Sequence, residues 1–522
     1  MTTSRRPRNV LILQQRPSPD GGYVPPHDNL IFACLEPPSR AGMGPSAIRL
    51  PRGAFDIGQV LRQLPRAWEP DLVWVSSSLA LTDDPSVPTG LPTTGYRTVL
   101  KLTDSHHMTR PIRRLVEYAR RVECQYHWTN YDRHHIHFFR AAGLPNVFWM
   151  PGSISMTPHE AAPVQRRPPG VLFCGNLSAS HVYRETLLTR LRQEGIEVRF
   201  GKRPGEYLPW SEYVQRFAEA QIVFNCSLNG DFNLRVFAVL MAGGFLLTDR
   251  LPRDSGLPLA FREGIHLECY GSAEELLEKV KHYLAHPDEA ARIARQGHAE
   301  YLEHYRPDVA TERLYRFVLD GEPLDPLYTA AEDQRDVTPP PTSREARARG
   351  GLDLDARIAL YELLQELHRT HEHLDVVHHP AIGPEVPADL RDLPRLSLTV
   401  LSGGGVPPPA RPWDVALLPA VSEPVFGEAL DVIARGLRAR GLLVCPAGPA
   451  PAPQLEGTLR RRGFARIRVA EEIEARYGLF ERRPGAAASS EPPLDLASVR
   501  APTLRQRMAG VAARFAPARR GA

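Results

Sequence analysis

Lysine is scarce in this sequence, and the excess of positive charge is small. Only four of the 64 basic residues are lysines (Lys101, Lys202, Lys279 and Lys281), and the rest are arginines. An arginine cluster is therefore weaker evidence for a functional site here than in a chain with mixed basic residues. The formal net charge of +4 over 522 residues is too small to indicate a nucleic-acid partner.

Paired cysteines and long apolar runs are also missing. The six cysteines are widely spaced without a C-x-x-C pair, which favours buried free thiols in a reducing compartment. Near the start, the apolar run lasts only from Val10 to Leu13, which is too short for a signal-peptide core or a membrane span. The sequence therefore predicts a cytoplasmic protein with no transmembrane segment.

The apolar residues that are present come in short runs that alternate with amphipathic stretches. Runs such as "NVLILQQ" and "DLVWVSS" alternate with stretches such as "PIRRLVEYARRVE" over residues 1–155. The alternation restarts with "GVLFCGN" in residues 156–330. Strands that alternate with helices indicate parallel sheets covered on both faces. We therefore predict an α/β fold with two Rossmann-like lobes, and a ligand cleft between the carboxyl ends of their sheets.

The remainder of the chain reads as a linker, a third domain and a tail. Residues 331–351 contain "VTPPPTSREARARGG", which is proline-rich and then charged, as is typical of a linker. Residues 352–483 resume the α/β alternation as a smaller third domain. Residues 484–522 form an Arg-rich stretch that we expect to be flexible. This tail either contacts an anionic membrane surface or a protein partner, or is simply solvated.

One stretch in the second lobe, "GDFNLRVFAVLMAGGFLLTDR", predicts a loop, a helix, a glycine pair and a buried strand. Asn233 is a good N-cap, and Gly243 and Gly244 end the helix and allow an immediate turn. Arg235 lies in the first helical turn, where a cation opposes the helix dipole and needs a compensating group. A diphosphate at the helix start would compensate it, while the alternative is a solvated arginine.

With its neighbours, this stretch resembles the donor-binding half of bacterial glycosyltransferases. The similarity extends over "FNCSLNGDFNLRVFAVLMAGGFLLTDRLP" and "FREGIHLECYGSAEELLEKVKHYLAHPDEAARIARQGHAEYLEHY". The group it resembles is the CgeB-like, spore-maturation group, whose members have a GT-B fold. The resemblance implies transfer of a sugar from a nucleotide-activated donor, with the acceptor in the first lobe and the donor in the second.

The resemblance also implies a set of donor-binding residues. Asn233 and Arg235 would face the donor phosphate or sugar, and the glycine pair and Thr248 would allow close approach of the nucleotide. At the position of Ala238, members of this family commonly carry a glutamate that contacts donor hydroxyls. Asp231 lies nearby and could partly substitute for it.

A second candidate for the donor site is "CGNLSASHVYRE". A strand runs into Gly175 and Asn176, and a serine-rich loop then leads to a helix with Arg184 in its first turns. This strand–loop–helix junction suits an anion, and an arginine there could bind a diphosphate bidentately.

The candidate catalytic residues lie in "LTDSHHMTR" of the first lobe. Asp104, His106 and His107 follow a buried strand, at the edge where α/β enzymes place their chemistry. A histidine beside an aspartate could act as a general base toward an acceptor hydroxyl. Six of the 19 histidines lie between His106 and His137, but their spacing matches no zinc signature, so no metal site is predicted.

The third region resembles the latter half of a class I methyltransferase sheet. Its only candidate for a cofactor loop, Gly403 to Gly405, lacks the acidic glycine-rich form of that family. We therefore interpret it as a degenerate module for assembly or acceptor docking, with methylation of the glycan as a weaker alternative.

The main hypothesis from the sequence is a glycosyltransferase that acts on an unknown acceptor, either a protein or a surface or spore glycan. Its donor would be a nucleotide-diphosphate sugar, with no tightly bound cofactor. The alternative is a catalytically inactive, glycosyltransferase-like scaffold, which would have a stable protein partner.

Overall fold

The structure is a computed structural model. It describes residues 7–15, 28–35, 48–80, 82, 84–106, 111–151, 159–161, 167–177, 181–201, 208–333, 352–369, 371–401, 412–418, 423–446, 458–466 and 477–483. The chain forms two compact units. The first comprises Met1–Asn176 and Arg184–Asp336, and the second comprises Leu177–Tyr183 and Val337–Ala522.

The first lobe of the first unit is built on a parallel sheet of seven strands, in the order β3-β2-β1-β5-β7-β8-β9. The strands are β1 (Asn9–Gln14), β2 (Asn29–Cys34), β3 (Ile48–Arg49), β5 (Leu72–Ser76), β7 (Arg97–Leu102), β8 (Tyr126–Thr129) and β9 (Val147–Trp149). The strand order reverses between β1 and β5, so a crevice is expected at the carboxyl edge there. The smaller elements are β4 (Ala54–Asp56), β6 (Val87–Thr89), α1 (Gly58–Leu61), α2 (Pro111–Val122), η3 (Arg133–His135) and α3 (Ile136–Ala141).

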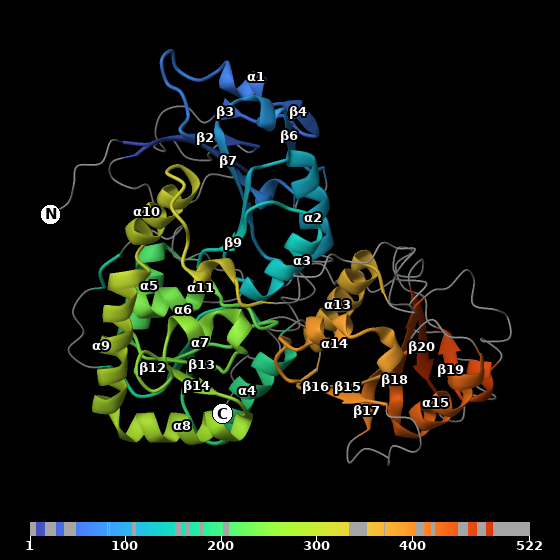
Figure 1. Ribbon diagram of the computed structural model, residues 1–522. Coiled ribbons are helices and arrows are strands. Elements are labelled where there is room, and N and C mark those ends of the chain that lie inside the picture. The colour runs from blue at the N-terminus through green and yellow to red at the C-terminus, as the bar shows by residue number, and fades with distance from the viewer. Residues whose placement is uncertain are drawn as a thin grey trace, which may run out of the picture. The chain divides into compact units, whose positions relative to one another are not determined.

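The second lobe contains a parallel sheet of five strands, in the order β11-β10-β12-β13-β14. The strands are β10 (Val171–Phe173), β11 (Val198–Phe200), β12 (Ile222–Phe224), β13 (Leu246–Asp249) and β14 (Glu268–Tyr270). The helices are α4 (Val182–Gln193), α5 (Trp210–Glu219), α6 (Leu234–Met241), α7 (Leu257–Ala260), α8 (Ala273–Ala285), α9 (Pro287–His304), α10 (Pro307–Val318) and α11 (Pro326–Thr329). Helices surround the strands β12, β13 and β14 in Figure 1, as expected for parallel strands that are buried on both faces.

Helix α6 forms as its sequence predicts. The Asn233 side chain accepts a hydrogen bond from the Arg235 N–H at 3.2 Å, which satisfies one of the free donors at the helix start. Gly243 ends the helix with a φ of +66°, a conformation that favours glycine. Gly244 lies against α5, because a Cβ there would lie 2.8 Å from the Phe217 carbonyl oxygen.

The second unit contains a six-stranded sheet in the order β16-β15-β17-β18-β20-β19, in which β20 runs antiparallel to both of its neighbours. The strands are β15 (Leu374–His378), β16 (Leu396–Val400), β17 (Trp413–Leu417), β18 (Leu437–Pro446), β19 (Phe464–Arg466) and β20 (Tyr477–Arg482). The helices are α13 (Leu354–Arg369), α14 (Glu385–Leu390) and α15 (Glu423–Gly436). The candidate cofactor loop, Gly403 to Gly405, and the Arg-rich tail lie outside the described residues.

Three features of the described part of the chain can be compared with the sequence. The chain has the predicted α/β fold, with mainly parallel sheets. All six cysteines are buried free thiols. Among the described residues, no helix is both long enough and apolar enough to cross a membrane.

Candidate functional site

The loop after β12 joins the second lobe to the first. Phe232 donates its backbone N–H to the Tyr131 carbonyl oxygen at 2.9 Å. The Asn229 side chain donates to the His106 carbonyl oxygen at 2.5 Å. These bonds bring two residues predicted from separate lobes, His106 and Asp231, next to each other at the carboxyl edges of the two sheets.

His106 lies between two carboxylates. Its Nδ1 is 3.0 Å from the Asp132 carboxylate, and its Nε2 is 3.7 Å from Asp231. Burial lowers the pKa of His106, but Asp132 and Asp231 outweigh burial and raise that pKa to about 10. A histidine that keeps its proton at neutral pH cannot accept one from a hydroxyl group. A general-base role for His106 therefore requires a different environment once substrates are bound.

The other two predicted catalytic residues are placed differently. Asp104 follows β7 and adopts a φ of +61°, an unusual backbone conformation for a residue other than glycine. Strained backbone of this kind is concentrated at functional sites. His107 lies outside the described residues.

Asp231 is held by its own loop. Its Oδ1 accepts hydrogen bonds from the Leu228 N–H at 2.6 Å and the Asn229 N–H at 3.2 Å. Burial raises the pKa of Asp231, but His106 and these two bonds lower it to about 2. Asp231 is therefore an ionised, buried carboxylate that faces the histidine of the opposite lobe.

Arg184 and Arg235 form a pair of cations at the carboxyl edge of the second sheet. Their guanidinium carbons lie 5.5 Å and 5.1 Å from the centre of the Phe173 ring. Burial and the neighbouring Arg235 lower the pKa of Arg184. Because the charge of Arg235 already disfavours the charge of Arg184, an anion that contacts both would remove this repulsion.

Main-chain carbonyl groups hold both guanidinium groups. Arg184 donates to the carbonyl oxygens of Asn176 at 2.9 Å and Cys226 at 2.6 Å. Arg235 donates its Nε–H to the Cys174 carbonyl oxygen at 2.7 Å. These acceptors supply part of the compensation that the sequence required for a cation in the first turn of α6.

Buried side chains set the direction of Arg235. Its Nη1 donates to the Asn225 side-chain oxygen. The Asn225 Nδ2 donates to Thr248 Oγ1 at 2.9 Å, and Thr248 lies 3.2 Å from Asp249 Oδ1. Thr248 thus positions Arg235 through Asn225.

The predicted glycines fall into two groups. Gly175 lies directly beside the arginine pair, since a Cβ there would come within 2.3 Å of Arg235 Nη2. Gly243 and Gly244 lie at the opposite end of α6, where Gly243 ends the helix and Gly244 packs against α5. The geometry shows a structural role for this pair, and the contact with nucleotide that the resemblance implied stays a prediction.

Two residues of this site were not among those predicted from the sequence. Asn225 follows β12, and Asp132 follows β8, so both lie at the ends of buried strands. That position, which singled out Asp104, would have singled them out as well. The carbonyl groups that hold the two arginines leave no signal in the sequence.

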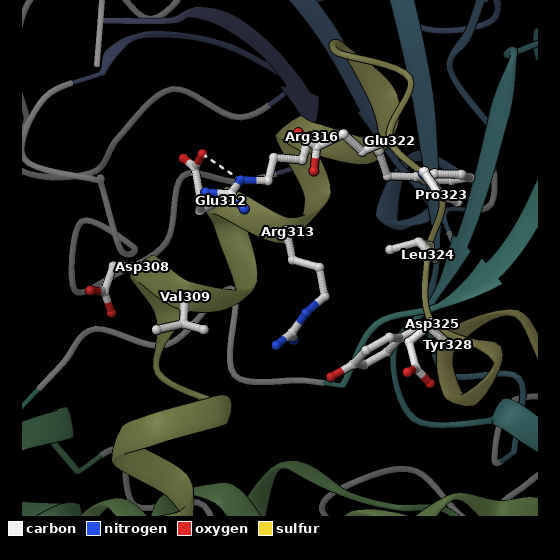
Figure 2. A pocket seen from close by; sticks show the side chains of 11 residues that line it. Asp308, Val309, Glu312, Arg313, Arg316, Glu322, Pro323, Leu324, Asp325 and Tyr328 are labelled. Atoms are coloured by element: carbon white, nitrogen blue, oxygen red, sulfur yellow. Dashed lines mark hydrogen bonds and ion pairs between the residues drawn. The ribbon is translucent and has the colours of Figure 1, made fainter. Parts of the chain in front are cut away.

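A cavity of about 480 Å³ lies elsewhere in this unit, between α10 and the segment that leads into α11. In Figure 2, Arg313 reaches toward Tyr328, and its guanidinium carbon is 4.5 Å from the ring centre. Arg316 pairs with Glu312 at 3.2 Å. None of the predicted site residues lines this cavity.

Comparison with known proteins finds a family match within the second lobe. A family described as glycosyl transferase-like matches residues 181–315. No curated protein gives a significant match. Among solved structures, HepE from Anabaena in complex with UDP-glucose shares 14% identity, with 60% of this chain and 100% of that chain covered and a TM-score of 0.42. Sucrose-phosphate synthase from Thermosynechococcus elongatus shares 10% identity at the same coverage, with a TM-score of 0.41. Residues 181–315 in the second lobe are therefore similar to a family described as glycosyl transferase-like.

Proposed function

We propose that this protein is a glycosyltransferase that uses a nucleotide-diphosphate sugar as its donor. The observation that carries the proposal is the pair formed by Arg184 and Arg235 at the carboxyl edge of the second sheet. Their contacts are set by backbone carbonyls and by Asn225, so the two charges are fixed before any ligand arrives. The family match over residues 181–315 includes both arginines.

In this proposal, the diphosphate of the donor binds against the two guanidinium groups. Negative charge builds up on the diphosphate as the bond to the sugar breaks. Preorganised cations stabilise that charge in the transition state, which is a principal way in which enzymes of this kind lower the barrier. Gly175 allows the donor and Arg235 to approach the end of β10 closely, because it carries no Cβ.

The acceptor would bind from the side of the first lobe. Asp104, His106 and His107 follow β7, and the loop that carries Asp231 and Asn233 meets this edge from the second lobe. The proposed division is residues 1–155 for the acceptor lobe and 156–330 for the donor lobe, followed by the linker, the domain of residues 352–483 and the tail.

Finer assignments are part of the same proposal. The stretch around Asn233 and Arg235 supports placement in the CgeB-like group, with transfer of a hexose in the cytoplasm to a protein or glycan. The third domain would be a degenerate, methyltransferase-like module that docks a protein partner or the acceptor.

A second candidate function is an inactive scaffold, and Ala238 is the observation that favours it. Ala238 is fully buried in α6 and has no carboxylate for donor hydroxyls. A scaffold would retain the fold and the arginine pair without turning over a donor.

A donor screen separates the two functions. Thermal denaturation is recorded with UDP, GDP, TDP and CDP and with the corresponding sugar nucleotides, and release of nucleoside diphosphate is measured for each sugar nucleotide. The enzyme is expected to show a raised Tm with one nucleotide, by mass action, and slow hydrolysis of its sugar conjugate. Binding without hydrolysis or transfer favours the scaffold. No shift with any of these nucleotides contradicts the glycosyltransferase proposal.

The variant Arg184→Ala tests the site, and Arg192→Ala is its matched control. Both residues lie on α4, but Arg192 contacts the ring of Phe200 at 4.8 Å. The Tm shift should be lost in the first variant and kept in the second.

A further inference from the structure

Three potential metal ligands converge in the first lobe, on the turn that follows β8. They are Asp132, His134 and His135, and their ligand atoms all lie within 4.8 Å of one another. All three side chains are at most 2% exposed. Asp132 precedes the 3₁₀ turn η3, and residues three apart on such a turn lie on the same side, which places Asp132 and His135 together.

A serine fixes which nitrogen of His135 is available. Ser105 Oγ is 2.5 Å from Asp132 Oδ2 and 2.8 Å from His135 Nδ1. The carboxylate can only accept, so it takes the single proton of the serine hydroxyl. The His135 Nδ1–H must then donate to the serine, and a neutral His135 has its lone pair on Nε2. Metal-binding histidines are commonly oriented in this way, by a hydrogen bond from the ring nitrogen that does not bind the ion.

We propose that Asp132, His134 and His135 bind one divalent transition-metal ion, with zinc as the ion that their two nitrogens and one oxygen suit best. Two imidazoles and one carboxylate form a known ligand set of zinc sites that keep a fourth position open. Ligand atoms at 2.0–2.1 Å from a tetrahedral ion lie about 3.4 Å apart. One ligand atom of each residue already lies within 4.8 Å of the others, so binding requires the side chains to rotate until His135 presents its Nε2 to the ion.

The ion would act as a positioning element at the junction of the lobes. Asp132 binds His106 as well, at 3.0 Å, and the other side of His106 faces Asp231. Fixing the Asp132 carboxylate therefore fixes the ring of His106. The inference goes beyond the proposed function, because metal binding is measured without any sugar donor.

Metal content tests the proposal directly. Full-length protein without a histidine tag is incubated with zinc, passed over a desalting column and analysed by inductively coupled plasma mass spectrometry. The wild type should retain about one zinc per chain, and a strong chelator should lower its Tm. His134→Gln and His135→Gln should each reduce retained zinc at least tenfold.

His127→Gln is the matched control. His127 is equally buried in the same lobe and bonds to the Pro145 carbonyl oxygen at 2.8 Å, outside the cluster. It should keep its zinc. Wild-type protein without stoichiometric zinc, or equal zinc in all four proteins, overturns the proposal.

Cobalt substitution keeps the test decisive if a cluster variant fails to fold. Co²⁺ added to folded wild-type protein should give the visible absorption bands of a four-coordinate site, and zinc should displace them. Absence of those bands overturns the proposal.

Discussion

Replacing Arg235 with alanine should weaken nucleotide binding in a protein that still folds. The change removes one of the two guanidinium groups beside Phe173. It also removes the donors to the Cys174 carbonyl and to the Asn225 side chain. In the unchanged protein, the third guanidinium nitrogen of Arg235, Nη2, lies beside Gly175, on the side where the donor is proposed to bind.

The size of each effect follows from these contacts. A hydrogen bond to a charged group contributes about 1.5–3 kcal/mol, so loss of one phosphate contact should weaken binding about 10- to 150-fold. In the free protein, two buried acceptors lose a donor, at a cost of about 1–3 kcal/mol for each acceptor. Relief of the repulsion that lowers the pKa of Arg184 offsets part of that cost. The loss of affinity should therefore be measured on folded protein, and stability should be measured separately.

Titration calorimetry at a temperature well below the Tm measures the affinity of the nucleoside diphosphate identified in the donor screen, and urea denaturation measures stability. Arg192→Ala serves again as the control and should bind within twofold of the wild type. Arg235→Lys should fall between wild type and alanine, because it keeps the charge and loses the planar fork. The reasoning is refuted if Arg235→Ala remains folded and binds the nucleotide as tightly as the wild type.

Three further changes probe the surroundings of the site. Thr248→Val should lower the free energy of unfolding, measured by urea denaturation, by about 1–3 kcal/mol and also weaken nucleotide binding, because the Asn225 amide loses its acceptor. Unchanged affinity would remove Thr248 from the site. Gly244→Ala should lower the free energy of unfolding by about 1–3 kcal/mol without changing the affinity, because the added Cβ would lie 2.8 Å from a carbonyl oxygen of α5. Weaker binding at unchanged stability would support a contact between the glycine pair and the nucleotide. Arg250→Gln should reduce stability by under about 1 kcal/mol at pH 7, measured by denaturation across pH. Hydrogen bonding to Arg250 lowers the pKa of Glu275 from 4.5 to about 2, so the difference from wild type should close as the pH falls from about 4.5 toward 2, and a constant difference would contradict this cause.

Much of the fold could be predicted because local and long-range signals agree. Apolar runs of strand length alternate with amphipathic stretches, and the structure places them in parallel sheets in both lobes. The N-cap at Asn233 and the glycine-terminated end of α6 are also local features, and both form as predicted. The edge shared by β10 and β12 brings Arg184 and Arg235 together, although 50 residues lie between them.

The sequence could not predict two features of the site: which part of a ligand each end of α6 could contact, and which backbone carbonyl groups hold Arg184. A helix of eight residues spans about 12 Å, so the two ends of α6 cannot both contact the same phosphate group. The resemblance gives no such distance, and the contact of the glycine pair with the nucleotide stays a prediction. The acceptors of Arg184 are the backbone carbonyl groups of Asn176 and Cys226. Every residue has such a group, so the sequence does not single these two out.

The structure also changes the meaning of the missing carboxylate at Ala238. This position is fully buried within α6, so a longer acidic side chain there would need a partner in a low-dielectric interior. Asp231 supplies a carboxylate to the junction by a different route, since it reaches His106 from the loop that precedes the helix. Two backbone N–H groups already donate to that carboxylate, and its other oxygen faces His106, so Asp231 stabilises the contact between the lobes. The carboxylate near the proposed donor site is therefore that of Asp231, which lies in the loop before α6 at the contact between the lobes.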